Sequence, residues 1–245
     1  MFVLPPDSGT TTRKLRISTN PVPAKGPLES MQSIFRHLIE FAIIFPAIVL
    51  HEISHGYVAY RLGDATAKRA GRLTLNPLAH IDPIGTVVLP ITMLVLSGGS
   101  YFFGWAKPVP IDPRNFRDER TGMLLTGIAG PGMNVVLALV AGLVSRAFPA
   151  AVFAPGQFTS IGSLLLFFCY GNLVLAFFNL IPIPPLDGSR VVQWFLPDTA
   201  RNTYSSIARY GFVILIGATW MIPGLFGAYL AVTVVPIFGL LTGAQ

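Results

Sequence analysis

Long apolar runs constrain the fold of this chain more than any other feature of its sequence. A helix needs ~20 mostly apolar residues to cross the hydrocarbon layer of a membrane. Runs of that length or longer occupy residues 33 to 62, 122 to 147, 160 to 181 and 207 to 242. Only 11% of the 245 residues are charged, against about a quarter in soluble domains. The sequence therefore predicts an all-α integral membrane protein, a polytopic helix bundle of four to five spans.

Two further segments do not fit a plain span. Residues 84 to 98 are apolar but barely long enough to cross, and Pro90 and Gly98 interrupt or end the run, which favours a re-entrant helix over a full crossing. Residues 101 to 112 are aromatic and proline-rich, and this composition favours an extended return over a helix. We therefore expect a short membrane-associated β-hairpin there. In the run 207 to 242, Pro223 and Gly224 predict two short helices or one broken helix.

The domain organisation that follows is simple. Residues 1 to 30 are rich in Pro, Thr and Ser and lack a continuous apolar stretch, so they are predicted to form a flexible polar tail without a function of its own. Residues 31 to 245 are predicted to form one polytopic membrane domain.

The net charge of +6 does not indicate a nucleic-acid partner, because the basic residues lie between apolar runs and not along one surface. Anionic lipid headgroups explain the excess. Eleven Lys and Arg residues lie in 61 to 72, 107 to 120 and 190 to 209, against four in the tail. Because cytoplasmic loops are enriched in Lys and Arg, these loops are predicted to face the cytoplasm.

The segment His51-Glu52-Ile53-Ser54-His55 is an HExxH motif in the last half of the first span. On a helix, the two imidazoles lie one turn apart on one face, spaced to bind one metal ion. Glu52 can take a proton from an attacking water and pass it to a leaving amine. Zn²⁺ suits this ligand set, since it accepts nitrogen and carboxylate oxygen in a tetrahedral shell. Ionisable groups within an apolar helix are costly, and a shared metal offsets that cost.

A third protein ligand is needed, and Asp187 is the best candidate. Most downstream acids lie in polar loops or tails, whereas Asp187 directly follows a spanning helix and the proline cluster at 182 to 185. The prolines end the helix and leave backbone groups that can line a polar cavity.

Taken together, HEISH and the later segment from Asn179 to Gly188, NLIPIPPLDG, resemble the paired signature of the site-2 proteases, which are intramembrane zinc metalloproteases. The segments 72 to 85, 104 to 116 and 129 to 134 are also similar to the compact bacterial-type branch of that family. The resemblance implies His51, His55 and Asp187 as zinc ligands and Glu52 as catalytic base and acid. It further implies cleavage of a single-span membrane protein, such as an anti-sigma factor or another tethered regulator.

Asn134 is similar in position to an asparagine near the active site of that family. A carboxamide on a membrane helix, beside glycines that permit close helix approach, can donate to a developing oxyanion or hold substrate backbone. Equally, it can form an interhelical hydrogen bond that only packs the bundle. His80 is expected to shape its loop and not to reach the site.

Two other classes of function remain open at this point. In a membrane transporter or metal-handling protein, the same His and Asp residues relay protons or pass a cation. That class does not require a glutamate beside the first imidazole, and no internal duplication is visible. An inactive relative that serves as a binding scaffold ranks last, because both motifs are intact.

Overall fold

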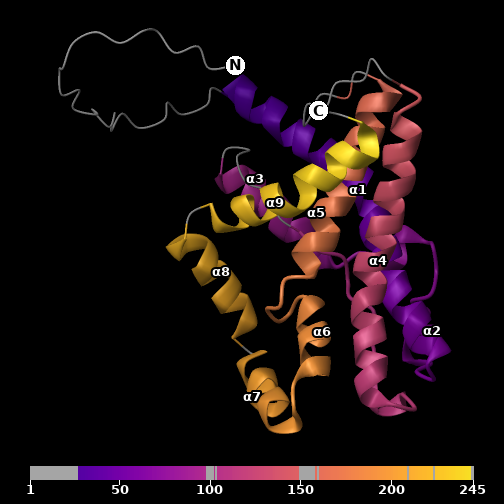
Figure 1. Cartoon of the computed structure of the whole chain (residues 1–245). Helices are drawn as coiled ribbons and strands as arrows, with labels where there is room; N and C mark the ends of the chain where they lie inside the picture. The colour runs from indigo at the N-terminus through magenta and orange to yellow at the C-terminus, as the bar shows by residue number, and fades with distance from the viewer. Residues whose placement is uncertain are drawn as a thin grey trace, which may run out of the picture.

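Four long helices form the frame of the molecule (Figure 1). The computed structural model describes residues 27–97, 102, 104–148, 158, 160–208, 210–222 and 224–243. Within these ranges, the frame consists of α1 (Pro27–Arg61), α4 (Glu119–Ser145), α5 (Ile161–Asn179) and α9 (Leu225–Thr242). All four are long and apolar enough to cross a membrane. The prediction of an all-helical membrane bundle is thereby confirmed, with four candidate spans among the described residues.

The first helix begins earlier than predicted. α1 starts at Pro27, so the last four residues of the predicted tail are helical, and the rest of that tail, residues 1–26, lies outside the described residues. The helix ends at Arg61, and Gly63 follows with a φ of 114°. A positive φ just past the last turn is typical of a glycine that terminates a helix.

The ends of α4 and α5 follow from local sequence. The side chain of Asp118 accepts a hydrogen bond from the amide of Arg120 and caps α4. Ser160 and Ser163 form a reciprocal capping box at the start of α5. Such side chains satisfy amides that have no partner inside the helix. α5 ends at Asn179, shortly before Pro182, as the proline cluster predicts.

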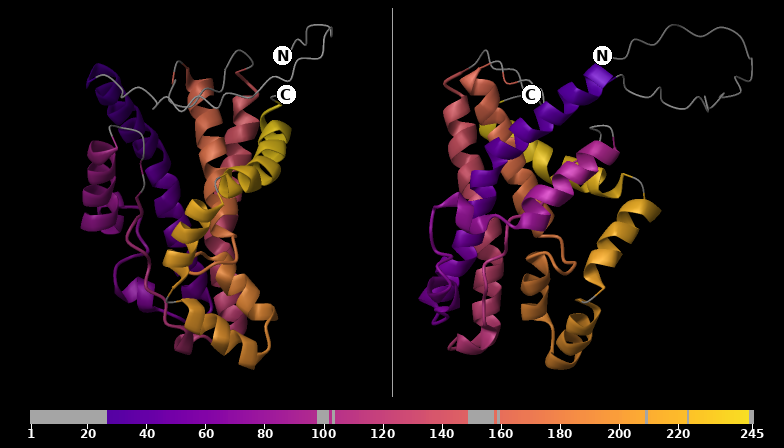
Figure 2. Two further views of the ribbon diagram at one scale, coloured as in Figure 1. Left: turned by 90° about the vertical axis from the view of Figure 1, so that its left-hand side faces the viewer. Right: turned by 180° about the vertical axis from the view of Figure 1, so that it is seen from behind.

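α4 is the central helix of the bundle and packs against α1, α5, α6 and α9. Both views in Figure 2 show α4 running beside α5, with α9 crossing them. The apolar core lies between α4, α5 and α9 and comprises Ala138, Ala141, Leu166, Cys169, Leu173, Val234 and Phe238. Large apolar side chains elsewhere on these helices, such as Val140 and Leu240, are more than half exposed, as expected of surfaces that face lipid.

Short helical segments connect α1 to α4. They are α2 (Thr66–Arg69), a 3-10 turn (Pro77–His80), a π-helical turn (Pro83–Val88) that continues into α3 (Leu89–Leu96), and a 3-10 turn (Pro113–Asn115). The continuous stretch Pro83–Leu96 is apolar but shorter than the four spans. A helix rises 1.5 Å per residue, so this stretch is too short to cross the hydrocarbon layer, which needs ~20 residues.

The predicted β-hairpin at 101 to 112 is not found. Residues 101 and 103 lie outside the described residues, and the described stretch 104–112 contains no strand. Its backbone bonds go elsewhere, because the amide of Trp105 donates to the carbonyl of Gly85 and the amide of Lys107 donates to the carbonyl of His80. Two prolines at 108 and 110 remove further amide donors, so a regular ladder cannot form there.

After α5, the chain forms α6 (Gly188–Phe195), α7 (Asp198–Ala208) and α8 (Gly211–Met221). Gly224, with a φ of 84°, separates α8 from α9, which confirms the predicted break near Pro223–Gly224. In Figure 1, α2, α6, α7 and the beginning of α4 lie at one end of the bundle, drawn at the bottom. The three basic loops singled out from the sequence therefore lie at the same end.

Candidate metal centre

The two histidines of the HExxH motif lie on the face of α1 that packs against α4. Their side chains are buried, with His51 and His55 only 6% and 4% exposed. The rings are one helical turn apart and meet edge to face, with centroids 4.6 Å from each other. Helical periodicity thus places both imidazoles together, as the spacing predicts.

Asp187 reaches the same point from the turn that follows α5. Its Oδ2 atom lies 3.2 Å from Nε2 of His51 and 3.1 Å from Nε2 of His55. Gly188 permits the turn to close this tightly, because a Cβ atom there would lie 2.1 Å from the carbonyl oxygen of Leu180. The sequence-predicted trio therefore converges, although Asp187 is 136 residues from His51.

The hydrogen bonds of the two rings determine which nitrogen atoms face the centre. Nδ1 of His55 lies 2.5 Å from the carbonyl oxygen of Thr126, which can only accept, so this nitrogen carries the proton. Nδ1 of His51 lies 2.5 Å from Oδ1 of Asn134 and donates in the same way. Both Nε2 atoms then present lone pairs, 3.0 Å apart, toward each other. This is the tautomer that metal-binding histidines adopt.

Three electron-pair donors, the two Nε2 atoms and Oδ2 of Asp187, thus meet in a buried space. One ligand atom from each residue lies within 4.8 Å of the others. A tetrahedral Zn²⁺ with bonds of about 2.0–2.1 Å separates its ligand atoms by about 3.3 Å, close to the separations observed. Without a cation, the lone pairs would repel one another at these distances. The donor set therefore fits a zinc ion.

A chain of carboxamides extends from His51 across the bundle. Asn134 on α4 accepts from His51 through Oδ1 and donates through Nδ2 to Oδ1 of Asn172 on α5, at 2.8 Å. Asn172 in turn donates to the carbonyl oxygen of Phe168. Both asparagines are 0% exposed. Asn134 thus makes the interhelical hydrogen bonds that were one of its two alternatives, and its contact with His51 holds that ring in orientation.

A glycine brings α4 close to the metal-binding group. A Cβ atom on Gly130 would lie 2.3 Å from Nε2 of His55 and 2.6 Å from Nε2 of His51. The segment AGPGMN signalled close helix approach, but not that this glycine abuts both rings. The carbonyl of Thr126, one turn earlier, was also missed, because a backbone acceptor leaves no trace in residue type.

Glu52 faces a different environment from its two neighbours. Its Oε2 atom accepts a hydrogen bond from the amide of Val109 at 3.0 Å. Together with His51, Glu52 lines a mostly apolar pocket of about 480 Å³ between α1, α5, Phe102 and the stretch 104–106. Phe41, Ile44, Phe167 and Phe178 supply part of its apolar wall. The metal-binding group is therefore accessible from a cavity that an apolar chain can occupy.

Three other polar residues are not part of the metal-binding group. His80 is 0% exposed, and its Nε2 atom donates to the carbonyl oxygen of Thr74 within its own loop. This agrees with a role in shaping that loop. His37 pairs with Glu40 at 2.8 Å, and Asn179 donates to the carbonyl of Leu175 inside α5.

A buried His-His-Asp group beside a glutamate, within a bundle of membrane-length helices, defines a membrane metallopeptidase by fold and site. A family model agrees. The model described as peptidase family M50 matches residues 40–222, a range that contains all the residues of the group. The chain therefore belongs to peptidase family M50, the site-2 protease family that its two motifs resemble.

Individual relatives carry names of the same kind. "Putative zinc metalloprotease YwhC" of Bacillus subtilis is 39% identical over 192 residues, which cover 75% of this chain and 80% of that protein. "Putative zinc metalloprotease Rip2" of Mycolicibacterium smegmatis is 31% identical over 173 residues, covering 69% of this chain and 62% of Rip2. No solved structure matches the chain significantly.

Proposed function

We propose that this chain is an intramembrane zinc endopeptidase that hydrolyses peptide bonds in or near the membrane span of tethered proteins. One observation carries the proposal. Three buried donor atoms of His51, His55 and Asp187 converge from two distant parts of the chain, and Glu52 lies beside them in the same pocket. Membership of a peptidase family and the names of the relatives support it.

In this proposal, His51, His55 and Asp187 hold the zinc ion and Glu52 is the catalytic base and acid. When bound, zinc acts as a Lewis acid that polarises the scissile carbonyl and lowers the pKa of water. Glu52 takes the proton from the attacking water and delivers it to the leaving amine. The amide of Val109 donates to Glu52 and so fixes where its carboxylate lies. Asn134 accepts from Nδ1 of His51 and so orients that ring, and the proposal assigns its second Nδ2 hydrogen to the developing oxyanion.

The pocket is the proposed binding site for substrate. A helical substrate hides its scissile carbonyls in its own hydrogen bonds, so it must unwind before water can attack. In an extended chain, alternate peptide groups point to opposite sides. Gly104, Trp105 and Ala106 all line the pocket. The amides of Trp105 and Lys107 are already bonded to the loop at 80–85, so the proposal assigns substrate pairing to the side with Gly104 and Ala106. We propose that an unwound substrate pairs with this side.

The topology we propose keeps residues 31–245 as one membrane domain. The stretch Pro83–Leu96 enters and leaves on the same side as a re-entrant segment, since it is too short to cross. The basic loops at the end of the bundle with α2, α6 and α7 face the cytoplasm, which places the metal centre toward that side. A tethered regulator such as an anti-sigma factor is a substrate that fits this arrangement.

The test combines metal content with cleavage of a labelled single-span protein in liposomes. The substrate carries Gly and Pro in its span, and a matched poly-Leu span is the control. Wild-type protein is expected to hold one zinc per chain and to cleave the first substrate in a chelator-sensitive manner. Glu52→Gln is expected to retain zinc and lose cleavage, because the amide cannot accept the proton.

Asp187→Ala tests the ligand assignment separately. We expect loss of both zinc and cleavage, whereas Asp198→Ala, at a side chain 76% exposed at the start of α7, should leave both unchanged. Full zinc occupancy in well-folded Asp187→Ala would exclude Asp187 as a ligand. Undiminished turnover in Glu52→Gln would exclude Glu52 as the base.

A further inference from the structure

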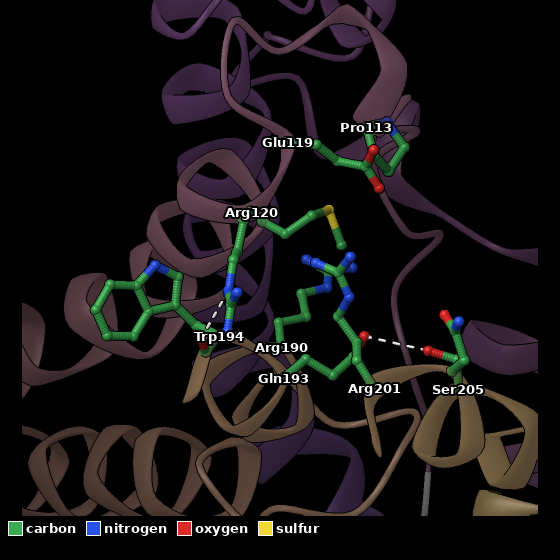
Figure 3. Close-up of a pocket in the computed structure, with 10 residues that line it drawn as sticks. Pro113, Glu119, Arg120, Arg190, Gln193, Trp194, Arg201 and Ser205 are labelled. Atoms are coloured by element: carbon green, nitrogen blue, oxygen red, sulfur yellow. Dashed lines mark hydrogen bonds between the residues drawn. The ribbon is translucent and has the colours of Figure 1, made fainter. Parts of the chain in front are cut away.

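A second, polar pocket lies between the beginning of α4 and the helices α6 and α7 (Figure 3). Its volume is about 310 Å³, and its charged lining residues are three arginines and one glutamate, Arg120, Arg190, Arg201 and Glu119. None of the three metal-binding residues lines it. The lining therefore carries a net positive charge outside the proposed catalytic site.

Arg190 is the most constrained of the three. Its Nη1 atom is buried and has no hydrogen-bond partner among the described residues. The nearest carboxylate oxygen that it pairs with, Oδ1 of Asp187, is 3.6 Å away, beyond hydrogen-bond distance. A buried guanidinium donor without an acceptor is costly. Figure 3 shows Arg190 extending from α6 toward the centre of the pocket, and because its side chain is 29% exposed, the guanidinium brings positive charge to that space.

Arg201 approaches the same space from α7 (Figure 3). Its ion pair with Asp198, at 3.0 Å, involves a carboxylate that is 76% exposed, and exposed pairs of this kind contribute little. Arg120 is held differently, since Nε and Nη2 donate to the carbonyl oxygens of Trp194 and Leu196. Carbonyls fix its guanidinium without neutralising the charge. Glu119 lies beside Pro113, apart from Arg201 and Ser205 in this view.

We propose that this pocket binds a phosphate group. Guanidinium forks donate paired hydrogen bonds to phosphate oxygens, and Asn202 and Ser205 add neutral polar groups to the lining. α6 ends with Trp194 and Phe195, which are 37% and 70% exposed. Aromatic side chains of this kind gather at the membrane–water interface. The pocket is therefore placed where the headgroup of an anionic phospholipid, or a free phosphate from the adjoining water, can enter it.

The experiment measures binding by the full-length zinc-loaded protein with two probes. One arm titrates inorganic phosphate by calorimetry. The other compares binding of phosphatidylglycerol and phosphatidylcholine by native mass spectrometry. Arg201→Gln removes a guanidinium that does not contact the metal-binding group, and Arg69→Gln, on an exposed arginine at the same end of the bundle, is the matched control. Arg201→Lys retains the charge without the fork.

Because a charged hydrogen bond is lost, Arg201→Gln should weaken binding by ~10-fold or more, Arg201→Lys by less, and Arg69→Gln by under about twofold. An effect in both arms, or in one alone, supports the site, and the responding arm identifies the source of the phosphate. Zinc content and helical circular dichroism should stay at wild-type levels in all variants. Equal binding of the two lipids together with no phosphate binding would overturn the proposal, as would equal losses in Arg201→Gln and Arg69→Gln.

Discussion

The two sides of α1 differ in how they hold their functional groups. On one side, His51 and His55 are buried, their Nδ1 atoms donate to groups on α4, and their Nε2 atoms face Asp187. On the other side, Glu52 lines a pocket of about 480 Å³ and accepts a hydrogen bond from one backbone amide. The two rings are thus held by α4 through their Nδ1 atoms, whereas Glu52 lines the cavity that His51 also borders.

The difference corresponds to two requirements of the proposed chemistry. Ligands bind a metal tightly when their rings are oriented in advance, and close packing supplies that orientation. The base must meet a polypeptide that enters and leaves, so it needs free space beside it. Variants on the ligand side should therefore change metal occupancy. Variants on the Glu52 side should change turnover while the metal stays bound.

The largest effect is expected at Gly130. In Gly130→Ala, the new methyl would lie 2.3 Å from Nε2 of His55, so α4 or the rings must move. We expect zinc content to fall below half and cleavage to fall by more than about 100-fold, since misplaced ligands lose the metal. Gly132→Ala is the control, because nothing lies within 4 Å of its added Cβ. Equal zinc content in the two variants would contradict the packing of α4 against the rings.

The next effect is expected along the asparagine chain. Asn134→Ala removes the acceptor for Nδ1 of His51, and loss of such a partner typically lowers metal affinity by ~10–100-fold. Asn172→Leu removes the hydrogen bond between Asn172 and Asn134, one step further from His51, so the loss of zinc affinity should be smaller. Chelator competition measures both affinities. If Asn134→Ala keeps wild-type zinc affinity but loses turnover, its role lies with substrate or oxyanion and not with the ring.

A smaller effect, confined to turnover, is expected at Val109. Val109→Pro removes the amide that donates to Glu52, so the carboxylate loses its fixed position and kcat should fall by ~10-fold, comparable to the loss of one hydrogen bond. Val109→Ala retains the amide and is the matched control. Zinc content should equal that of wild type in both variants. A parallel loss of zinc in Val109→Pro would show that the two sides of α1 are not independent.

The convergence of His51, His55 and Asp187 can be anticipated from the sequence because its signals are local. The HExxH spacing fixes the relation of His51 to His55 on any helix, and the proline cluster before Asp187 marks a broken helix end within the membrane. Apolar runs similarly identify the four spans. In each case a single segment carries the information, so no knowledge of its neighbours is needed.

The Glu52 side is less predictable because its structure depends on distant partners. Residues 104–112 have a strand-like composition, yet Trp105 and Lys107 donate to isolated carbonyls at 85 and 80, and no strand results. The ligand side also has one contact that the sequence does not reveal, because the acceptor for His55, the carbonyl of Thr126, is a backbone atom that every residue possesses. Arg190 lies shortly after the segment NLIPIPPLDG, which ends at Gly188. Only the fold reveals that its Nη1 atom is buried without a hydrogen-bond partner.

The smallest effect on activity is expected at Asp64, which connects the end of α1 to the stretch 104–115. Substitution there should chiefly lower stability. Asp64 is 0% exposed and accepts from the hydroxyl and amide of Thr66, the amide of Asp112 and the side chain of Asn115. Burial alone would raise the pKa of its carboxyl, but these donors, the Thr66 hydroxyl foremost, hold the pKa below its ordinary value of 3.8.

Because the folded-state pKa is lowered, the stabilisation from Asp64 is present above about pH 4 and is lost as the pH falls through the folded value. Asp64→Asn replaces an acceptor by a donor, so thermal unfolding in detergent at pH 7 should show a loss of ~1–3 kcal/mol. The wild type should lose more stability than Asp64→Asn when the pH is lowered, because only the wild type has an Asp64 carboxylate to protonate. Asp112→Asn, which breaks a pair with an arginine 86% exposed, should destabilise less. If zinc affinity stays constant while turnover falls modestly in Asp64→Asn, the wall formed by 104–112 acts on Glu52 alone.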